Sequence, residues 1–172
     1  MLAKKYEQAK KTGTLDVSDM KLKVLPPIPD SIVRLDCSKN QLTCLPALPE
    51  SLTGLNCYMN QLVCLPDLPD TLQELYCSQN LLTSLPDLPE SLTHLYCSSN
   101  RLTYLPNLPC SLNQLMCFNN PWDASFARIV DGPDPILSTR SYYNDTVSTC
   151  WTRNNYYNTI VDSIYAMMRP VV

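Results

Sequence analysis

Thiols are the most reactive side chains in this sequence of 172 residues, which contains nine cysteines. Five of them recur at intervals of twenty residues. Side chains on adjacent parallel strands do not readily supply the near-perpendicular dihedral angle of a disulfide, and five thiols in one file cannot surround zinc tetrahedrally. Cysteine packs as a small hydrophobe, so we expect this file to be a buried core of reduced thiols. Its members are Cys37, Cys57, Cys77, Cys97 and Cys117.

The only histidine, His94, is a second candidate for chemistry. Glu74 lies twenty residues before it and Ser98 four residues after it. A carboxylate can orient a histidine that acts as a base on a serine nucleophile. However, no segment supplies an evident oxyanion hole or enclosing pocket, and three glycines could hardly build a phosphate-binding loop. We therefore expect a non-catalytic protein that requires no cofactor and no metal ion.

An internal repeat of twenty residues positions these side chains. Residues 31–110 divide into four units that align without a gap, and the first reads SIVRLDCSKNQLTCLPALPE. Residues 111–120 begin a fifth unit, and residues 11–30 form a degenerate one. A period of this length with the pattern LxxLxCxxNxL is the sequence signature of a leucine-rich repeat. A single unit buries too little apolar surface to fold alone, so the units must stack.

Each unit combines a short strand with an extended return path. Leu35 and Cys37 alternate with polar neighbours, which indicates a strand with one buried side. Pro46 and Pro49 favour polyproline-like backbone on the return path and exclude a long helix there. An asparagine follows each strand, where its amide can satisfy backbone groups in the turn. We expect these side chains to stack as a ladder: Asn40, Asn60, Asn80, Asn100 and Asn120.

The exposed strand positions differ between otherwise matching units, so we expect binding specificity to lie on the face that they form. Charged residues dominate the first units, whereas aromatic residues and methionine gather in the later ones. These are the residue types enriched at the cores of protein interfaces. The predicted partner-binding residues are Arg34, Asp36, Tyr58, Glu74, Tyr76, His94, Tyr96, Met116 and Phe118.

Units of the form LPxLPxSLxxLxCxxNxLTxLP resemble the short leucine-rich repeats of bacterial secreted effectors, and similar repeats occur in large viruses of amoebae. The resemblance covers roughly residues 12–121. It implies an α/β repeat solenoid with a right-handed superhelix, short parallel strands on the concave face, extended proline-rich convex arms and helical caps. It also implies binding to another protein or peptide, in the setting of a virulence or viral factor that acts on a host. Some of these effectors carry a ubiquitin ligase domain with a catalytic Cys-x-Asp motif, and no cysteine here has that spacing.

The segments at the two ends differ from the repeats. We expect residues 1–13 to form an N-terminal helical cap that ends at Gly13 and residues 14–120 to form the repeat array. Residues 121–172 contain eight of the fourteen aromatic side chains. They are predicted to form a mainly helical C-terminal cap or a docking segment. If this segment mediates self-association, for example in a homodimer, the protein is instead a structural component of an assembly or particle.

Composition and charge argue against several functions and locations for this protein. A net charge of −3 argues against general nucleic-acid binding. No apolar run approaches the roughly 18 residues of a membrane span, so no membrane association is expected. The start, Met1 to Tyr6, becomes charged at once and lacks the apolar core of a signal peptide. We therefore expect a cytoplasmic location, either in the producing cell or in a host cell.

Overall fold

The computed structural model describes residues 2–122, which contain one helix and six short strands. The elements are α1 (Leu2–Thr12), β1 (Thr14–Asp16), β2 (Arg34–Asp36), β3 (Gly54–Asn56), β4 (Glu74–Tyr76), β5 (His94–Tyr96) and β6 (Gln114–Met116).

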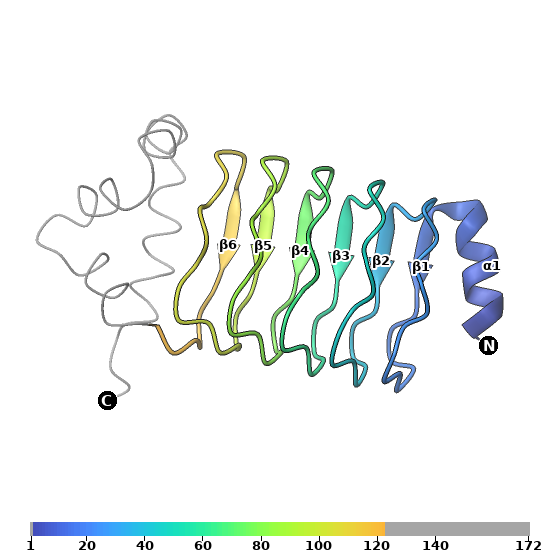
Figure 1. Ribbon diagram of the computed structural model, residues 1–172, viewed down its shortest axis with the longest axis horizontal. Helices are drawn as coiled ribbons and strands as arrows, with labels where there is room; N and C mark the ends of the chain where they lie inside the picture. The colour runs from blue at the N-terminus through green and yellow to red at the C-terminus, as the bar shows by residue number, and fades with distance from the viewer. Residues whose placement is uncertain (1, 123–172) are drawn as a thin grey trace, which may run out of the picture.

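The six strands form one parallel sheet in the order of the chain (Figure 1). Each residue of a strand pairs with the residue twenty positions later in the next strand, from Thr14 opposite Arg34 to Tyr96 opposite Met116. The predicted parallel-strand solenoid is therefore confirmed, and the degenerate first unit contributes a strand in the same register. We call one strand with its return path a rung. In residues 2–122 the return paths contain no helix.

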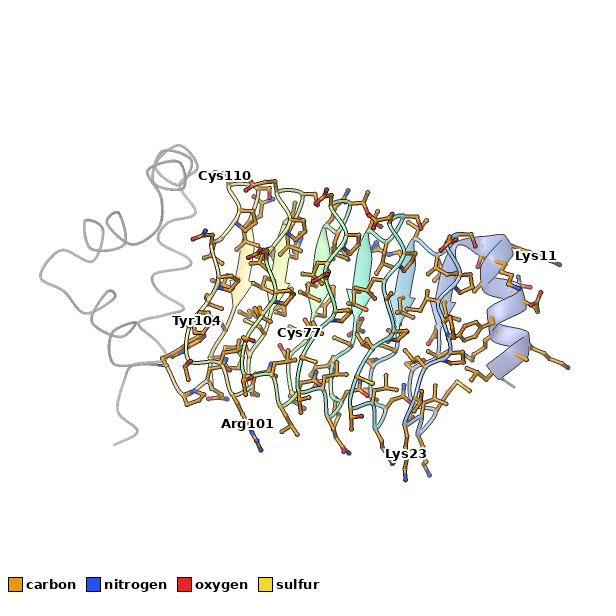
Figure 2. All side chains as sticks on the ribbon, in the orientation of Figure 1. Lys11, Lys23, Cys77, Arg101, Tyr104 and Cys110 are labelled. Atoms are coloured by element: carbon orange, nitrogen blue, oxygen red, sulfur yellow. The ribbon has the colours of Figure 1, made fainter. Side chains whose placement is uncertain are left out.

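A single core of leucine and cysteine runs through all the rungs. The second residue of each strand, such as Leu35 or Leu55, is almost inaccessible to solvent, and so are the cysteines two positions later. Figure 2 shows Cys77 inside the coil, whereas Lys23 and Arg101 project from its surface. In the first rung Val17 takes the position of the cysteine and is equally buried. Thiol and branched alkyl groups are interchangeable here because both fill the space as small hydrophobes.

The predicted asparagine ladder is present. The side-chain amide of Asn80 donates to the carbonyls of Cys57 at 3.0 Å and Cys77 at 3.1 Å. Its oxygen accepts the backbone N–H of Leu62 at 3.0 Å. Asn60 and Asn100 make the equivalent bonds one rung away. Each side-chain amide thus joins two rungs. It forms hydrogen bonds with buried backbone groups in the turns, which have no partner in the sheet.

A second polar ladder, which the sequence analysis missed, lies in the turns before β3, β4, β5 and β6. The hydroxyl of Ser51 donates to the carbonyls of Asp30 and Ile32 at 2.6 and 2.7 Å. Thr71 and Ser91 donate to the preceding rung in the same way. Serine and threonine recur here because a short hydroxyl can reach a carbonyl one rung away.

The helix α1 packs against the first rung, at the N-terminal end of the solenoid in Figure 1. Ala9 is buried, while Leu2 and Tyr6 pack against the core and the Tyr6 hydroxyl donates to the Pro26 carbonyl at 3.2 Å. Gly13, with φ of 71°, donates its N–H to the Ala9 carbonyl. A left-handed residue of this kind commonly ends a helix, and glycine adopts it without a steric cost.

The predicted C-terminal helices and their aromatic side chains lie outside the described residues, apart from Trp122, which packs against the core. The domain boundaries at residues 13 and 120 and the alternative of self-association through residues 121–172 therefore stay predictions. Within residues 2–122, no helix is long and apolar enough to cross a bilayer.

Candidate functional site

A hollow of about 650 Å³ opens on the concave face of the sheet. Cavities of 300–1,000 Å³ are typical of ligand sites. Eight of the nine predicted partner-binding residues line this concave hollow, and His94 is the exception. The eight are Arg34, Asp36, Tyr58, Glu74, Tyr76, Tyr96, Met116 and Phe118.

Two stacked tyrosines form the centre of the concave hollow. Tyr76 and Tyr96 are register partners on β4 and β5, and their ring centroids are 4.9 Å apart with 11° between the ring planes. The sequence predicts a separation of about 5 Å, and the structure confirms it. The Tyr96 hydroxyl also donates to the side-chain oxygen of Gln114 on β6. Stacking and hydrogen bonding together hold the rings in place before any partner arrives.

Burial raises the pKa of the Tyr76 phenol, and the nearby Glu74 carboxylate raises it further. The phenol therefore remains neutral near pH 7 and can both donate and accept hydrogen bonds.

Apolar side chains extend the aromatic centre towards β6. Met116 and Phe118 are 46% and 43% exposed, although both are large and hydrophobic. Tyr58 is half-buried and lines the same concave hollow. Open apolar surface next to ordered aromatic rings is characteristic of interface hot spots.

The charged part of the concave hollow contains an ion pair that the sequence did not predict. Glu74 does not pair with His94; its Oε2 accepts a hydrogen bond at 2.7 Å from the guanidinium of Arg34, two rungs away. The intervening rung has Gly54 at this position, and a β-carbon added there would meet the Arg34 side chain at 3.5 Å. His94 instead contacts the hydroxyl of Thr93, with 2.8 Å between Nδ1 and Oγ1.

Gly54 and Asn56 were not among the predicted site residues. Asn56 donates from its amide to Asp36 Oδ2 at 3.0 Å, and both residues line the concave hollow. A glycine inside a strand often marks a close approach of another group, and this signal could have identified Gly54.

The residues two positions after each strand continue its alternation, so the strand pattern predicts that they face outwards: Ser18, Ser38, Tyr58, Ser78, Ser98 and Phe118. Ser38 and Ser98, predicted to face outwards, are 6% and 4% exposed. The residue one rung later is aromatic in both cases, Tyr58 and Phe118, whereas Ser18 and Ser78 are followed by serines and are less buried. A large ring can shield the small serine of the preceding rung.

The Ser98 hydroxyl has no hydrogen-bond partner, although its own N–H donates to Ser78 Oγ at 3.0 Å. It is therefore not bonded to His94, and the Glu74, His94 and Ser98 side chains do not form a catalytic relay. The hydroxyl lies in the wall of the concave hollow instead.

The five stacked cysteines are unreactive because they are buried. Burial raises the pKa of the Cys37 and Cys117 thiols from the usual 9.0 to about 12, and it raises those of Cys57, Cys77 and Cys97 as well. The thiolate is the reactive form of cysteine. These five side chains therefore serve as core packing.

These features define the class of protein. One short parallel strand per twenty residues, an asparagine ladder between the rungs and a variable concave face make the fold a leucine-rich repeat solenoid. No protein-family model and no curated protein sequence matches the chain.

Solved structures of bacterial effectors are similar to this chain, as the repeat sequences predict. YopM from Yersinia enterocolitica is 41% identical with a TM-score of 0.61, over 61% of this chain and 23% of that one. The leucine-rich repeat domain of a Shigella effector is 35% identical with a TM-score of 0.68, over 69% of this chain and 56% of that one. YopM from Yersinia pestis, a leucine-rich effector protein, is 28% identical with a TM-score of 0.56, over 70% of this chain and 47% of that one. The chain thus spans between about a quarter and just over half of these proteins.

Proposed function

We propose that this protein is a non-catalytic interaction module that binds a partner protein or peptide through its concave hollow. The observation that carries the proposal is the ordered Tyr76–Tyr96 stack beside the exposed Met116 and Phe118. Rings that are already held in place lose little conformational entropy when a partner covers them.

The chemistry of the concave face favours a protein partner over a nucleic acid. The columns of the six strands carry one guanidinium, Arg34, and it is already paired with Glu74. Nucleic-acid binding depends on several cations that neutralise phosphates. The similar effector structures support a partner in a host cell, and the reduced thiol file favours a reducing cytoplasm.

The test compares capture of partners by the wild-type chain and by the variant Tyr76→Ala/Tyr96→Ala. The protein is immobilised, exposed to lysate of its own cells or of a host cell, and the retained proteins are quantified by mass spectrometry. Loss of two aromatic anchors at an interface commonly costs more than about 2 kcal/mol, so we expect specific capture to fall at least tenfold. The melting temperature should fall only slightly, since an aromatic pair contributes about 0.5–1.5 kcal/mol.

A matched control is Tyr104→Ala, which removes a tyrosine that is 52% exposed and does not line the concave hollow. It should leave capture unchanged. A second control, Tyr76→Phe/Tyr96→Phe, keeps the rings and removes the hydroxyls, and it should retain most of the capture. Undiminished capture by the double alanine variant would show that the partner binds elsewhere.

A further inference from the structure

The concave face changes in character from β1 to β6, and the concave hollow covers it from Asp36 to Met116, with Asp16 just outside the lining. The third residue of each strand faces this side of the sheet. It is a carboxylate on β1 and β2, an amide on β3, an aromatic ring on β4 and β5 and a thioether on β6. In register, these residues are Asp16, Asp36, Asn56, Tyr76, Tyr96 and Met116.

The two carboxylates at the acidic end lack a compensating ion pair. Asp16 and Asp36 are direct register partners, and like charges opposite each other destabilise a sheet. Within residues 2–122 the ion pairs are Lys10 with Glu7 and Arg34 with Glu74.

Neutral donors hold these carboxylates in place. Asp16 Oδ1 accepts the N–H and the hydroxyl of Ser18 at 2.9 and 2.8 Å. Asp36 accepts the N–H of Ser38 at 2.9 Å and the amide of Asn56 at 3.0 Å. The ammonium group of Lys5 donates to the main-chain carbonyl of Asp16 at 2.6 Å. The bonds from Ser18 lower the pKa of the Asp16 carboxyl, and the nearby Lys5 ammonium lowers it further, so the carboxyl remains ionised at neutral pH and its charge is partly compensated by Lys5.

The opposite end of the concave hollow is apolar and uncharged. Tyr76, Tyr96, Met116 and Phe118 line it, and the buried Ser98 hydroxyl below them has no partner. This end therefore offers a partner apolar contact area.

We propose, on the basis of the protein-binding function above, that the concave hollow binds an extended partner segment that carries a basic residue and a large apolar residue. The basic side chain lies between Asp16 and Asp36, and the apolar side chain covers Tyr76, Tyr96 and Phe118. Arginine suits the acidic end better than lysine, because its planar donor fork can serve two carboxylates together.

The geometry also sets the spacing of the two residues. The midpoint of the carboxylate pair and the midpoint of the tyrosine pair are three strand spacings apart, or about 14 Å at ~4.8 Å per strand. An extended chain rises about 3.3 Å per residue. The basic and apolar residues should therefore be about four positions apart in the partner.

The experiment uses synthetic ten-residue peptides with a glycine and serine background. One peptide carries arginine and tryptophan four positions apart, a second has the reverse order, and matched peptides replace arginine by glutamate. Binding to the full chain is measured by fluorescence anisotropy at low and high salt. We expect one of the two arginine peptides to bind at least tenfold more tightly than its glutamate counterpart, and salt at 0.5 M to reduce that ratio to below about threefold.

The decisive variant is Asp16→Asn/Asp36→Asn. Asn56, one rung later, accepts the N–H of Tyr58 in the way that Asp36 accepts that of Ser38, so asparagine is compatible with this turn. We expect the variant to lose most of the preference for arginine over glutamate. The control Asp67→Asn/Asp70→Asn removes two exposed carboxylates that do not line the concave hollow, and it should retain the preference.

The outcomes separate this proposal from the broader one. If the arginine peptides do not bind, or bind no better than the glutamate peptides, or keep their preference in the aspartate variant, the proposed partner chemistry is wrong. Capture of the cellular partner that still depends on Tyr76 and Tyr96 would then leave the concave interaction site standing. If peptide binding and capture both survive Tyr76→Ala/Tyr96→Ala, the concave site itself is wrong.

Discussion

Arg34 and Glu74 are forty residues apart in the chain, yet the guanidinium of Arg34 donates to Glu74 Oε2 at 2.7 Å. The side chain crosses the intervening rung over Gly54, where an added β-carbon would already be in van der Waals contact with it at 3.5 Å. The pair crosses the border between the charged and aromatic parts of the concave hollow. The charges of Arg34 and Glu74 therefore compensate each other, and neither forms an ion pair with Asp16 or Asp36.

A double-mutant cycle with Arg34→Gln and Glu74→Gln measures this pair. The two side chains are 52% and 29% exposed, so solvent screens the interaction, and we expect a coupling of about 0.2–1 kcal/mol in the free energy of unfolding. The same cycle with Glu74→Gln and His94→Gln should give no coupling. A larger coupling to His94 than to Arg34 would contradict the observed pairing.

The asparagine ladder predicts a larger effect at a single position. Asn80→Ala leaves the N–H of Leu62 without its partner in a buried turn, and the carbonyl of Cys57 keeps only the bond from Asn60. We expect the free energy of unfolding, measured by urea denaturation, to fall by about 1–3 kcal/mol. The control is Asn113→Ala at an exposed position, which should change it by less than about 0.5 kcal/mol. Equal effects of the two variants would rule out the structural role of the ladder.

The cysteine file predicts a loss of stability in alkali. The folded-state pKa of Cys37 and Cys117 is about 12, above the usual 9.0, so the folded protein keeps protons that the unfolded chain releases. Stability is therefore complete below pH 9 and falls as the pH rises from 9 towards 12, by up to about 1.4 kcal/mol per pH unit for each thiol. Urea denaturation at pH 8 to 11 measures the slope.

A matched variant isolates the contribution of one thiol from that of the tyrosines. Cys77→Val copies the first rung, where Val17 occupies the same buried position. It should make the alkaline slope shallower by the share of one thiol. An unchanged slope would show that the Cys77 thiol ionises equally in the folded and unfolded states.

Replacement of Ser98 and of Ser78 by alanine should have different effects on the free energy of unfolding. Ser98→Ala removes a buried hydroxyl without a partner, so we expect the free energy of unfolding to stay constant or to rise by up to about 1 kcal/mol. Ser78→Ala removes the acceptor of the Ser98 N–H and should lower it by about 1–2 kcal/mol. Thermal denaturation distinguishes the two, and a clear loss in Ser98→Ala would mean that its hydroxyl is bonded in solution.

The residue before each ladder asparagine adopts a left-handed conformation, with φ between 55° and 57° from Lys39 to Asn119. Methionine at position 59 pays a steric cost there of about 1–2 kcal/mol, and asparagine tolerates the conformation better. Met59→Asn should therefore raise the free energy of unfolding by about 0.5–1 kcal/mol, whereas β-branched Met59→Val should lower it. Chemical denaturation checks both, and the reverse order would exclude strain at this position.

The sequence alone determined the parts of this protein that repeat. The period of twenty fixes the register, because slipping the pairing by one residue would expose the leucines and bury the polar columns. Burial of the cysteine file, the bonds of Asn80 and the spacing of Tyr76 and Tyr96 all follow from this register, and the structure confirms each of them.

Tertiary structure decided the interactions that depend on how far a side chain reaches and on what its neighbours leave open. Arg34 is long enough to reach Glu74 across Gly54, and the contact between Glu74 and His94 that the sequence allows does not form. Ser98 is buried next to a rung that carries Phe118, although the strand pattern places it outwards. A repeat specifies where each backbone position lies, but side chains of unequal size compete for the same concave space, and their packing settles which of them meet.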